Sequence, residues 1–332
     1  MFVQIPCMKF YGLCYILLGV VTWLSPAQAA GRSVPHTDHS VLATGTWYKL
    51  AIAREGIYKI DKSLLNSMGI NTSAGIRLYG TGGRMLPEAV SSARYDDLPE
   101  VALMAVDDYL LFYAPGPHSW TYQGSTWYHT LNLYSDTAYY FLQVSGGGKR
   151  IATDANVPVS TTIVQSFDYH DYYENDSLNL LQSGKQWWGP AFSSTQTSRT
   201  IPFTLPFTPS SLSINTRVGA RSGGTSKFDV AIAGNTGGSL TLGAITGNIF
   251  EAFATTTSGT FTATPNGTSC PVTFTFTPGA SGATGWLDYV NLNARMPLQL
   301  TADAPLFFRD AGSPGQIPKY LLQGAGTQTS IW

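Results

Sequence analysis

The sequence predicts a mainly β protein, in which a small mixed, β-rich module is followed by a β-sandwich module of jelly-roll-like type. Three observations predict this class. Gly residues, 34 in all, separate short segments of alternating apolar and polar residues. Only one segment carries both helix start and stop signals. Hydrophobic residues make up 43% of the chain and aromatic residues 13%, which supplies enough apolar surface for a core and argues against disorder.

The first 29 residues are predicted to be a secretory signal peptide. Tyr11–Leu24 is an apolar run that is shorter than the roughly 20 residues of a membrane-spanning helix. Ala27-Gln28-Ala29 then fits signal peptidase cleavage after Ala29. An uncleaved N-terminal anchor is the alternative. Residues 30–45 follow without apolar periodicity and are expected to form a flexible leader, so we expect an exported protein without a direct membrane span.

The charge and cysteine content argue against two further classes, nucleic-acid-binding proteins and proteins stabilised by disulfides. Charged residues make up 12% of the chain and the net charge is −1, which excludes the basic clusters that nucleic acids need. Signal cleavage removes Cys7 and Cys14 and leaves Cys270 as the one cysteine. No intrachain disulfide can then form, so stability must come from an apolar core.

The first module is predicted over residues 46–155. Residues 47–52 are largely apolar on both faces, as in a covered strand, and Ile57–Ile60 is expected to be the return strand after the Glu55-Gly56 turn. Asp61 is the expected N-cap of a helix over Lys62–Met68 that ends at Gly69. Further strands are expected at Ile76–Tyr79, Val101–Val106, Tyr109–Tyr113 and Thr137–Val144.

The β-sandwich module is predicted over residues 161–312, after a linker that begins at Gly146-Gly147-Gly148. Its short strand patterns are separated by Gly, Asn and Pro turns, which is typical of a sandwich or jelly roll. The expected strands are Arg199–Leu205, Ser211–Val218, Lys227–Ala233, Ser239–Leu242, Phe250–Thr255, Thr260–Thr264, Cys270–Thr277, Trp286–Asn293 and Leu298–Leu300.

Five segments rich in aromatic residues and glycine carry a family resemblance. They are TWYKLAIAREGIYKID (Thr46–Asp61), IRLYGTGG (Ile76–Gly83), DYLLFYAPGP (Asp108–Pro117), HDYYENDSLNLLQSGKQWWGPAF (His170–Phe192) and GWLDYVNLNARMPL (Gly285–Leu298). In this order they resemble the N-terminal region of type IX secretion sortases, a gingipain-like family of cysteine endopeptidases. The resemblance runs from about Trp47 to Trp332. It implies that residues 313–332 are the truncated start of the peptidase domain that follows.

The resemblance implies a function for the whole family. Its members cleave the C-terminal signal domain from exported cargo and join the cargo to lipopolysaccharide at the outer-membrane surface, using a Cys thiolate with a His base. The matching catalytic positions lie outside this chain, which holds no His-Gly dipeptide. The chain is therefore expected to be the non-catalytic region, inert alone, that braces the peptidase domain. Its expected partners are outer-membrane attachment-complex proteins and exported cargo proteins.

Two other functions remain open. One is a free-standing secreted β-sandwich module that binds a glycan or a protein, and the other is a decayed gene fragment. No catalytic, cofactor-binding or metal-ligating residue is assigned, and no cofactor is expected.

Cys270 is the first candidate for chemistry. It could pair with His118, His129 or His170 as a Cys–His nucleophile, but it lies inside a Thr/Phe strand pattern with no adjacent His. A small buried or half-buried thiol is the favoured interpretation.

An acidic segment is the second candidate. Asp168, His170, Asp171, Glu174 and Asp176 could supply oxygen ligands for Ca²⁺, but their spacing matches no EF-hand loop. A solvated connector between the modules, paired with Arg or Lys, is favoured.

For most of the remaining motifs, a purely structural role in the core or in a turn is favoured over a binding role. Trp187 and Trp188 could offer one indole to a sugar ring, but core packing of at least one of them is expected. Turns are expected at Asp96-Asp97, Asp107-Asp108 and Gly80-Thr81-Gly82-Gly83, the last because no P-loop Lys follows. The motifs Asp136-Thr137-Ala138 and Asp176-Ser177-Leu178 resemble O-glycosylation acceptors of Bacteroidota.

Overall fold

The computed structural model describes residues 36–71, 75–152, 158–160, 162–264, 266–301, 304–313 and 315–327, together with 329 and 331. The chain divides into two units, Met1–Ser40 and Val41–Trp332. The predicted signal peptide lies outside the described residues, as do residues 30–35 of the leader, whereas residues 36–45 are described and contain a short 3-10 helix. The second unit is almost entirely β, which confirms the predicted fold class. None of the helices in the described ranges is both long and apolar enough to cross a membrane.

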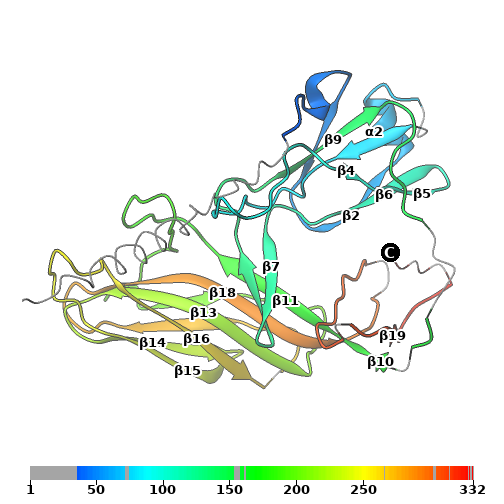
Figure 1. The fold of residues 1–332 in the computed structure, drawn as a ribbon. Coiled ribbons are helices and arrows are strands. Elements are labelled where there is room, and N and C mark those ends of the chain that lie inside the picture. The colour runs from blue at the N-terminus through cyan, green and yellow to red at the C-terminus, as the bar shows by residue number, and fades with distance from the viewer. Residues whose placement is uncertain are drawn as a thin grey trace, which may run out of the picture. The chain divides into compact units, whose positions relative to one another are not determined.

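The second unit holds two separate apolar cores. The first core is built from residues 52–142 and the second from residues 167–298. Each core has its own sheets (Figure 1). The module boundaries at residues 46–155 and 161–312 stay a prediction.

The first core lies between two small antiparallel sheets, with strand orders β1-β9-β3-β4 and β2-β6-β5. A short 3-10 helix, η1 (Val41–Ala43), precedes them. The strands and the helix are β1 (Tyr48–Ile52), β2 (Gly56–Ile60), α2 (Lys62–Ser67), β3 (Ile76–Tyr79), β4 (Glu100–Val101), β5 (Met104–Val106), β6 (Tyr109–Ala114) and β9 (Ala138–Val144).

Two expectations in this module are wrong in the same way. The strand after β1 does not return beside it, because β1 pairs with β9 whereas β2 pairs with β6. The predicted strand at 101–106 is likewise divided into β4 and β5, which belong to different sheets. In both places the chain crosses between the sheets, and this crossing lets Ile52, Ile60 and Leu103 all be buried in one core.

The predicted helix is confirmed as α2. The Asp61 carboxylate accepts a hydrogen bond from the Leu64 amide at 3.0 Å, which satisfies a first-turn donor. Leu65 turns into the core, where it is 2% exposed. Gly69 follows with φ +74°, the left-handed conformation that ends helices.

The second core lies between two four-stranded antiparallel sheets, with strand orders β11-β18-β13-β16 and β12-β17-β14-β15. Inward side chains alternate with outward ones along β14, as expected for a sandwich. The strands are β11 (Ser166–Glu174), β12 (Ser198–Ile201), β13 (Ser211–Arg221), β14 (Ser226–Ile232), β15 (Asn235–Leu242), β16 (Thr255–Ala263), β17 (Val272–Thr277) and β18 (Thr284–Pro297).

Two of the strands expected in this module are absent from the described segments where they were placed. Residues 298–300 form isolated backbone hydrogen bonds and no continuous strand. Residues 250–254 form a loop. In that loop the Glu251 carboxylate accepts hydrogen bonds from the amides of Thr246 and Gly247 at 2.7 and 3.0 Å. The turn that these bonds close leaves Phe250 91% exposed instead of in a sheet.

Two smaller sheets complete the unit, and neither was predicted. β7 (Ser119–Gln123) and β8 (Thr126–Thr130) form a hairpin whose turn residues, Gly124 and Ser125, both have positive φ. β10 (Thr162–Val164) pairs in parallel with β19 (Pro318–Tyr320). Tyr320 of β19 and Leu322 pack against the second core.

Candidate functional site

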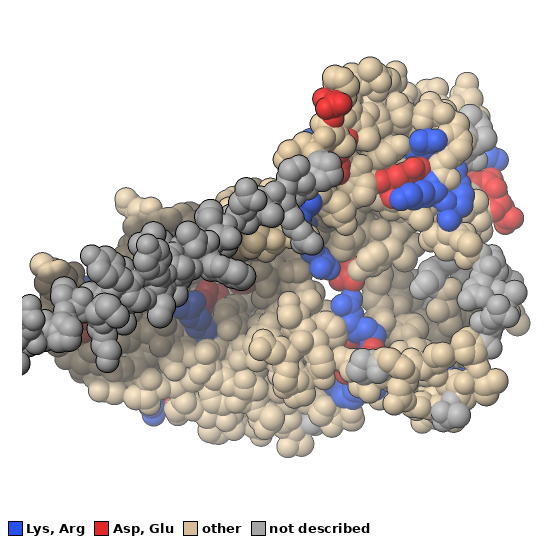
Figure 2. Space-filling model, in the orientation of Figure 1, with Lys and Arg blue, Asp and Glu red and all other residues tan. Residues whose placement is uncertain are grey.

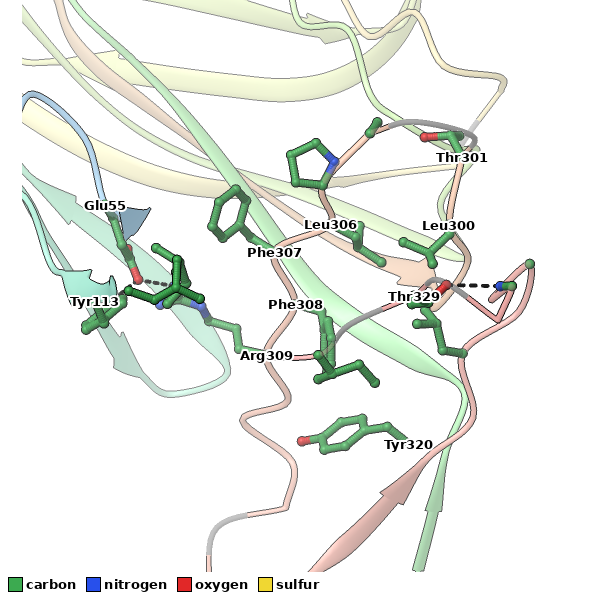
Figure 3. Close-up of a pocket in the computed structure, with 18 residues that line it drawn as sticks. Glu55, Tyr113, Leu300, Thr301, Leu306, Phe307, Phe308, Arg309, Tyr320 and Thr329 are labelled. Carbon is green, nitrogen blue, oxygen red and sulfur yellow. Dashed lines mark hydrogen bonds and ion pairs between the residues drawn. The ribbon is translucent and has the colours of Figure 1, made fainter. Parts of the chain in front are cut away.

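One cavity, of about 1000 Å³, is a groove with a mainly apolar lining. β2 and β6 form one wall with Ile57 and Leu111, and residues 304–309 form another, with Leu306 and Phe307 (Figure 3). The remaining lining residues are Leu300, Thr301, Tyr320, Leu322, Gly324, Gly326, Thr329 and Ile331. We refer to this cavity as the apolar groove.

One end of the groove is polar, and its polar side chains bond to one another. The Glu55 carboxylate accepts hydrogen bonds from Arg309 Nη2 and from the Tyr113 hydroxyl, each at 2.7 Å, as Figure 3 shows. Burial, together with this carboxylate, raises the pKa of Tyr113 to about 12. The Arg309 carbonyl also accepts from the Asp168 amide at 2.9 Å, so residue 309 links the first module to β11.

The lining of the groove is mainly apolar. Its bulky side chains are partly open to solvent, with Ile57 39%, Tyr113 50% and Phe307 61% exposed. Glu55 and Arg309 are its charged lining residues, and they form an ion pair with each other.

A second feature is a buried histidine cluster beneath the β7–β8 hairpin, which lies beside β11 in Figure 1. His129 Nδ1 lies 3.2 Å from Glu174 Oε2. The His129 ring stacks on Tyr172, with 3.4 Å between the ring centroids. Trp120 covers His170 at 4.1 Å and meets the edge of His129 at 5.0 Å. Aromatic rings thus exclude water from both imidazoles.

Because water is excluded, the side chains of this cluster favour their neutral forms. Burial lowers the pKa of His129 and of His170 to about 4, and it lowers the pKa of His118 as well. Burial also raises the pKa of Glu174 to about 7. Because both shifts disfavour charge, we expect a hydrogen bond between neutral His129 and protonated Glu174 between pH 4 and 7, in place of an ion pair.

The hairpin is tied to the sandwich by a second contact. Asn293 Oδ1 accepts from the Trp127 amide at 2.7 Å, and Asn293 Nδ2 donates to the Trp127 carbonyl at 3.2 Å. We refer to the pairs His129–Glu174 and Trp127–Asn293 together as the hairpin clasp.

The predicted acidic segment is not the solvated connector that was favoured. It forms β11, a half-buried strand paired with β18. The alternation of the strand separates the carboxylates, because neighbouring residues point to opposite faces. Asp168 pairs with Arg295 at 2.6 Å, whereas Asp171 accepts from the Tyr172 amide at 2.8 Å.

Glu174 and Asp176 instead approach Asp288 of β18. Their carboxylate oxygens lie within 4.8 Å of one another, and burial raises the pKa of Asp288 to about 6. Arg217 Nη1 ion-pairs with Asp288 at 3.2 Å. Because this guanidinium already offsets part of the negative charge, we assign no metal ligand here.

Cys270 is a buried core thiol, as predicted. It is 1% exposed, and its amide donates to the Phe203 carbonyl at 2.9 Å, next to β17. Burial raises the pKa of the thiol, which disfavours the reactive thiolate. The three candidate histidines lie together on the hairpin side of the opposite sheet, so the structure does not build a Cys–His pair with them.

Trp188 is also a core residue, which confirms the expected packing of one indole. It is 3% exposed and packs over Gly219, where an added Cβ would lie 2.8 Å from the ring. Its faces are therefore closed to a sugar. Trp187 is half-buried, and its Nε1 donates to the Gly184 carbonyl at 3.2 Å.

The expected turns are confirmed where the backbone requires them. Gly82 and Gly83 have φ of +89° and +77°, and Asp107, between β5 and β6, has φ +42°. Asp97 lies in a bend, where its carboxylate accepts from the Leu98 amide. The two O-glycosylation motifs stay predictions.

The charged side chains on the face drawn in Figure 2 occur in small groups of both signs between broad uncharged areas. This agrees with the low charge content of the sequence. The hairpin clasp and the apolar groove were both missed from the sequence. The one available signal was the high aromatic content of residues 118–130, which a surface loop would not need.

Comparisons with known proteins were made for the whole chain. No family model and no curated protein matches it. Among solved structures, the dimeric latent PorU from Porphyromonas gingivalis matches with a TM-score of 0.73 and 23% identity. The match covers 84% of this chain and 27% of that chain, so the chain has the fold of a region of PorU. This confirms the sequence resemblance at the level of the fold.

Two further matches are much weaker. A carbohydrate-binding module, CBM36, in complex with calcium and xylotriose has a TM-score of 0.25 and 17% identity, over 37% of this chain and 98% of that chain. The insecticidal delta-endotoxin Cry8Ea1 from Bacillus thuringiensis also has a TM-score of 0.25, with 14% identity over 54% of this chain and 30% of that chain. Scores this low carry no argument about this chain.

Proposed function

We propose that this chain is the non-catalytic N-terminal region of a type IX secretion sortase. The fold match to PorU over 84% of the chain is the observation that carries the proposal. The order of the five aromatic and glycine-rich segments supports it from the sequence. The chain spans about a quarter of the length of PorU, since it covers 27% of that chain, so the activity belongs to a longer protein.

The sortase reaction needs groups that the longer protein would supply. A Cys thiolate attacks the peptide carbonyl of the cargo, the C-terminal signal domain leaves, and an amine on lipopolysaccharide takes the acyl group. Cys270 is unsuited to this role because it is buried in the sandwich core with a raised pKa. The proposed part of this region is to brace the peptidase domain and to shape its cleft.

The bracing role is supported by contacts that hold the two modules together. The hairpin clasp joins β8 to β11 and β18, and the ion pair Arg309–Glu55 joins residues 254 positions apart. A platform with two linked cores resists deformation better than one core on a flexible tether. In the cell we place it at the outer-membrane surface, after export by the signal peptide, in contact with attachment-complex proteins and cargo.

The test compares this chain with the protein encoded by the full-length gene. Both are assayed for cleavage of a cargo carrying its C-terminal signal domain and for transfer of the acyl group to an amine. We expect activity in the full-length protein and none in this chain. Activity in this chain that is lost in Cys270→Ala would contradict the proposal, as would a full-length gene that encodes no peptidase domain.

A free-standing glycan-binding module is the competing function. It relied on Trp187, Trp188 and the tyrosines as contacts to a glycan, and Trp188 is closed to solvent. Binding of the purified chain to a glycan array, abolished by Trp187→Ala, would favour it.

A further inference from the structure

The loop between β15 and β16, residues 243–254, carries two neighbouring apolar side chains that project into solvent. Ile249 is 88% exposed and Phe250 is 91% exposed. In Figure 1 this loop is the yellow segment at one end of the sandwich. Single apolar residues on a surface are ordinary, whereas two large ones side by side and almost wholly exposed suggest a contact surface. We refer to Ile249 and Phe250 as the apolar tip.

Hydrogen bonds inside the loop hold the apolar tip in this position. Glu251 Oε2 accepts from the amides of Thr246 and Gly247 at 2.7 and 3.0 Å, and from the Thr246 hydroxyl at 2.9 Å. The Phe250 amide donates to Asn248 Oδ1 at 3.0 Å, and the Glu251 amide donates to the Asn248 carbonyl at 3.0 Å. These amides therefore keep their partners when water is removed from around the tip.

The base of the same loop carries a cation. Arg221 Nη1 donates to the Phe253 carbonyl at 2.6 Å, and the guanidinium lies 4.5 Å from the centroid of the Phe253 ring. Arg221 is exposed, and it takes part in none of the ion pairs found among the described residues. The neighbouring turns at 222–225 and 278–283 touch each other and hold no ionisable residue. This end of the sandwich thus offers an apolar tip beside an unneutralised positive charge.

We propose that this end of the sandwich binds the surface of a lipid bilayer, with the apolar tip inserted among phosphate-bearing headgroups and Arg221 against a phosphate. The inference rests on the placement at the outer-membrane surface in the proposed function. A convex apolar tip can enter a bilayer at any point, whereas a protein partner would need a pocket of matching shape. The edge of the hydrocarbon region also requires amides that are already bonded, and the loop supplies them. A guanidinium is well suited to a phosphate.

The size of the contact sets what it can do. Two apolar side chains and one cation give a weak, reversible attachment in the interface, in the way that a single short lipid chain does. Such a contact orients the protein on the membrane and does not anchor it alone.

The experiment measures binding of the mature chain to vesicles. The protein begins at residue 30, so the apolar run of the predicted signal peptide does not itself bind lipid. Vesicles of phosphatidylethanolamine with phosphatidylglycerol supply anionic, phosphate-bearing headgroups, and binding is read by cosedimentation over a series of lipid concentrations. Phe250→Ser removes one side chain of the tip. Val90→Ser is the matched control, because Val90 is 90% exposed on the loop between β3 and β4.

We expect Phe250→Ser to raise the lipid concentration at half-binding roughly tenfold or more, since a buried Phe ring contributes at least that factor. Phe250→Leu and Val90→Ser should leave it within about twofold of the parent value. Arg221→Gln should weaken binding about fivefold, and Arg221→Lys, which keeps the charge, should restore most of it. A parent chain that does not bind the vesicles would overturn the proposal, and so would binding that Phe250→Ser leaves unchanged.

A second readout separates insertion from electrostatic adsorption. Ile249→Cys is labelled with an environment-sensitive fluorophore, while Cys270, 1% exposed, stays unlabelled in the native protein. Vesicles should shift the emission at residue 249 to the blue, and brominated lipid should quench it, whereas the same label in Val90→Cys should not respond. A label at residue 249 that stays silent on bound protein would overturn the insertion. Circular dichroism and the thermal midpoint confirm that each variant folds.

The two proposals fail in different ways. If the full-length protein cleaves cargo but the mature chain does not bind vesicles, the proposed function stands and the lipid contact is wrong. If the chain binds vesicles through residue 250 but the full-length protein has no cleavage activity, the lipid contact stands and the proposed function is wrong.

Discussion

Replacement of Glu174 by Gln should change how the stability of this protein depends on pH. Glu174 is buried against His129, with 16% of its side chain exposed, and burial raises its pKa from 4.5 to about 7. Gln has almost the same shape and cannot ionise. It keeps a polar partner for His129 and removes only the titration.

The sign follows from proton linkage. Between pH 4.5 and 7 the folded protein holds the Glu174 proton and the unfolded chain does not, so the free energy of unfolding falls as the pH rises through this range. One pKa unit corresponds to about 1.4 kcal/mol, and the rise from 4.5 to about 7 therefore costs the native state about 3 kcal/mol above pH 7. The Glu174→Gln variant escapes this loss.

The assay is urea unfolding of both proteins at a series of pH values from 4.5 to 8.5, followed by tryptophan fluorescence. We expect equal free energies of unfolding at pH 4.5 and a variant more stable by about 3 kcal/mol at pH 8.5. His129 and His170 titrate in both proteins, so their contributions cancel in the difference. Glu88→Gln, at a carboxyl that is 79% exposed, is the matched control and should change stability by well under 1 kcal/mol.

A pH-independent difference would refute the reasoning, because it would mean that Glu174 is not protonated in the native state near neutral pH. A variant that is less stable than the parent at pH 6–7 would refute it more directly. That result would show a true ion pair between a charged His129 and Glu174, in place of the neutral hydrogen bond inferred from their burial.

Three further predictions concern the second core. Arg295→Met should lower the free energy of unfolding by about 3–5 kcal/mol in urea denaturation, because it leaves the Asp310 carboxylate, 4% exposed, without its partner at 2.7 Å. Gly219→Ala should cost about 1–3 kcal/mol by overpacking against the Trp188 ring, as measured by thermal unfolding. The Cys270 thiol should stay unreactive toward Ellman's reagent at pH 8 and react fully in guanidinium.

Each of these has an outcome that would contradict it. Gly243→Ala is the control for position 219, because an added Cβ there meets nothing within 4 Å, and the two variants should not be equally stable. An Arg295→Met variant as stable as the parent would mean that the buried carboxylate finds another partner. Fast labelling of native Cys270 would place the thiol outside the core.

Features set by a few neighbouring residues could be predicted from the sequence. The Asp61 cap, the left-handed Gly69 and the Asp107 turn each depend on backbone geometry within four residues. The alternation in β14 and the apolar surroundings of Cys270 are also local, because side chains along a strand point to alternate faces. These signals fixed the β class and the burial of the thiol.

Only the tertiary structure decided which strands pair and what the modules present to a partner. β1 pairs with β9, about 90 residues away, and His129 meets Glu174 across 45 residues, whereas Glu55 meets Arg309 across 254. No local preference encodes such contacts, since their free energy comes from burying surfaces that form only when both cores are complete. The acidic segment shows the consequence. Its charges predict solvent exposure one residue at a time, but the neighbouring strand and the aromatic hairpin half-bury it, so that Asp168 pairs with Arg295 and Glu174 meets the buried His129.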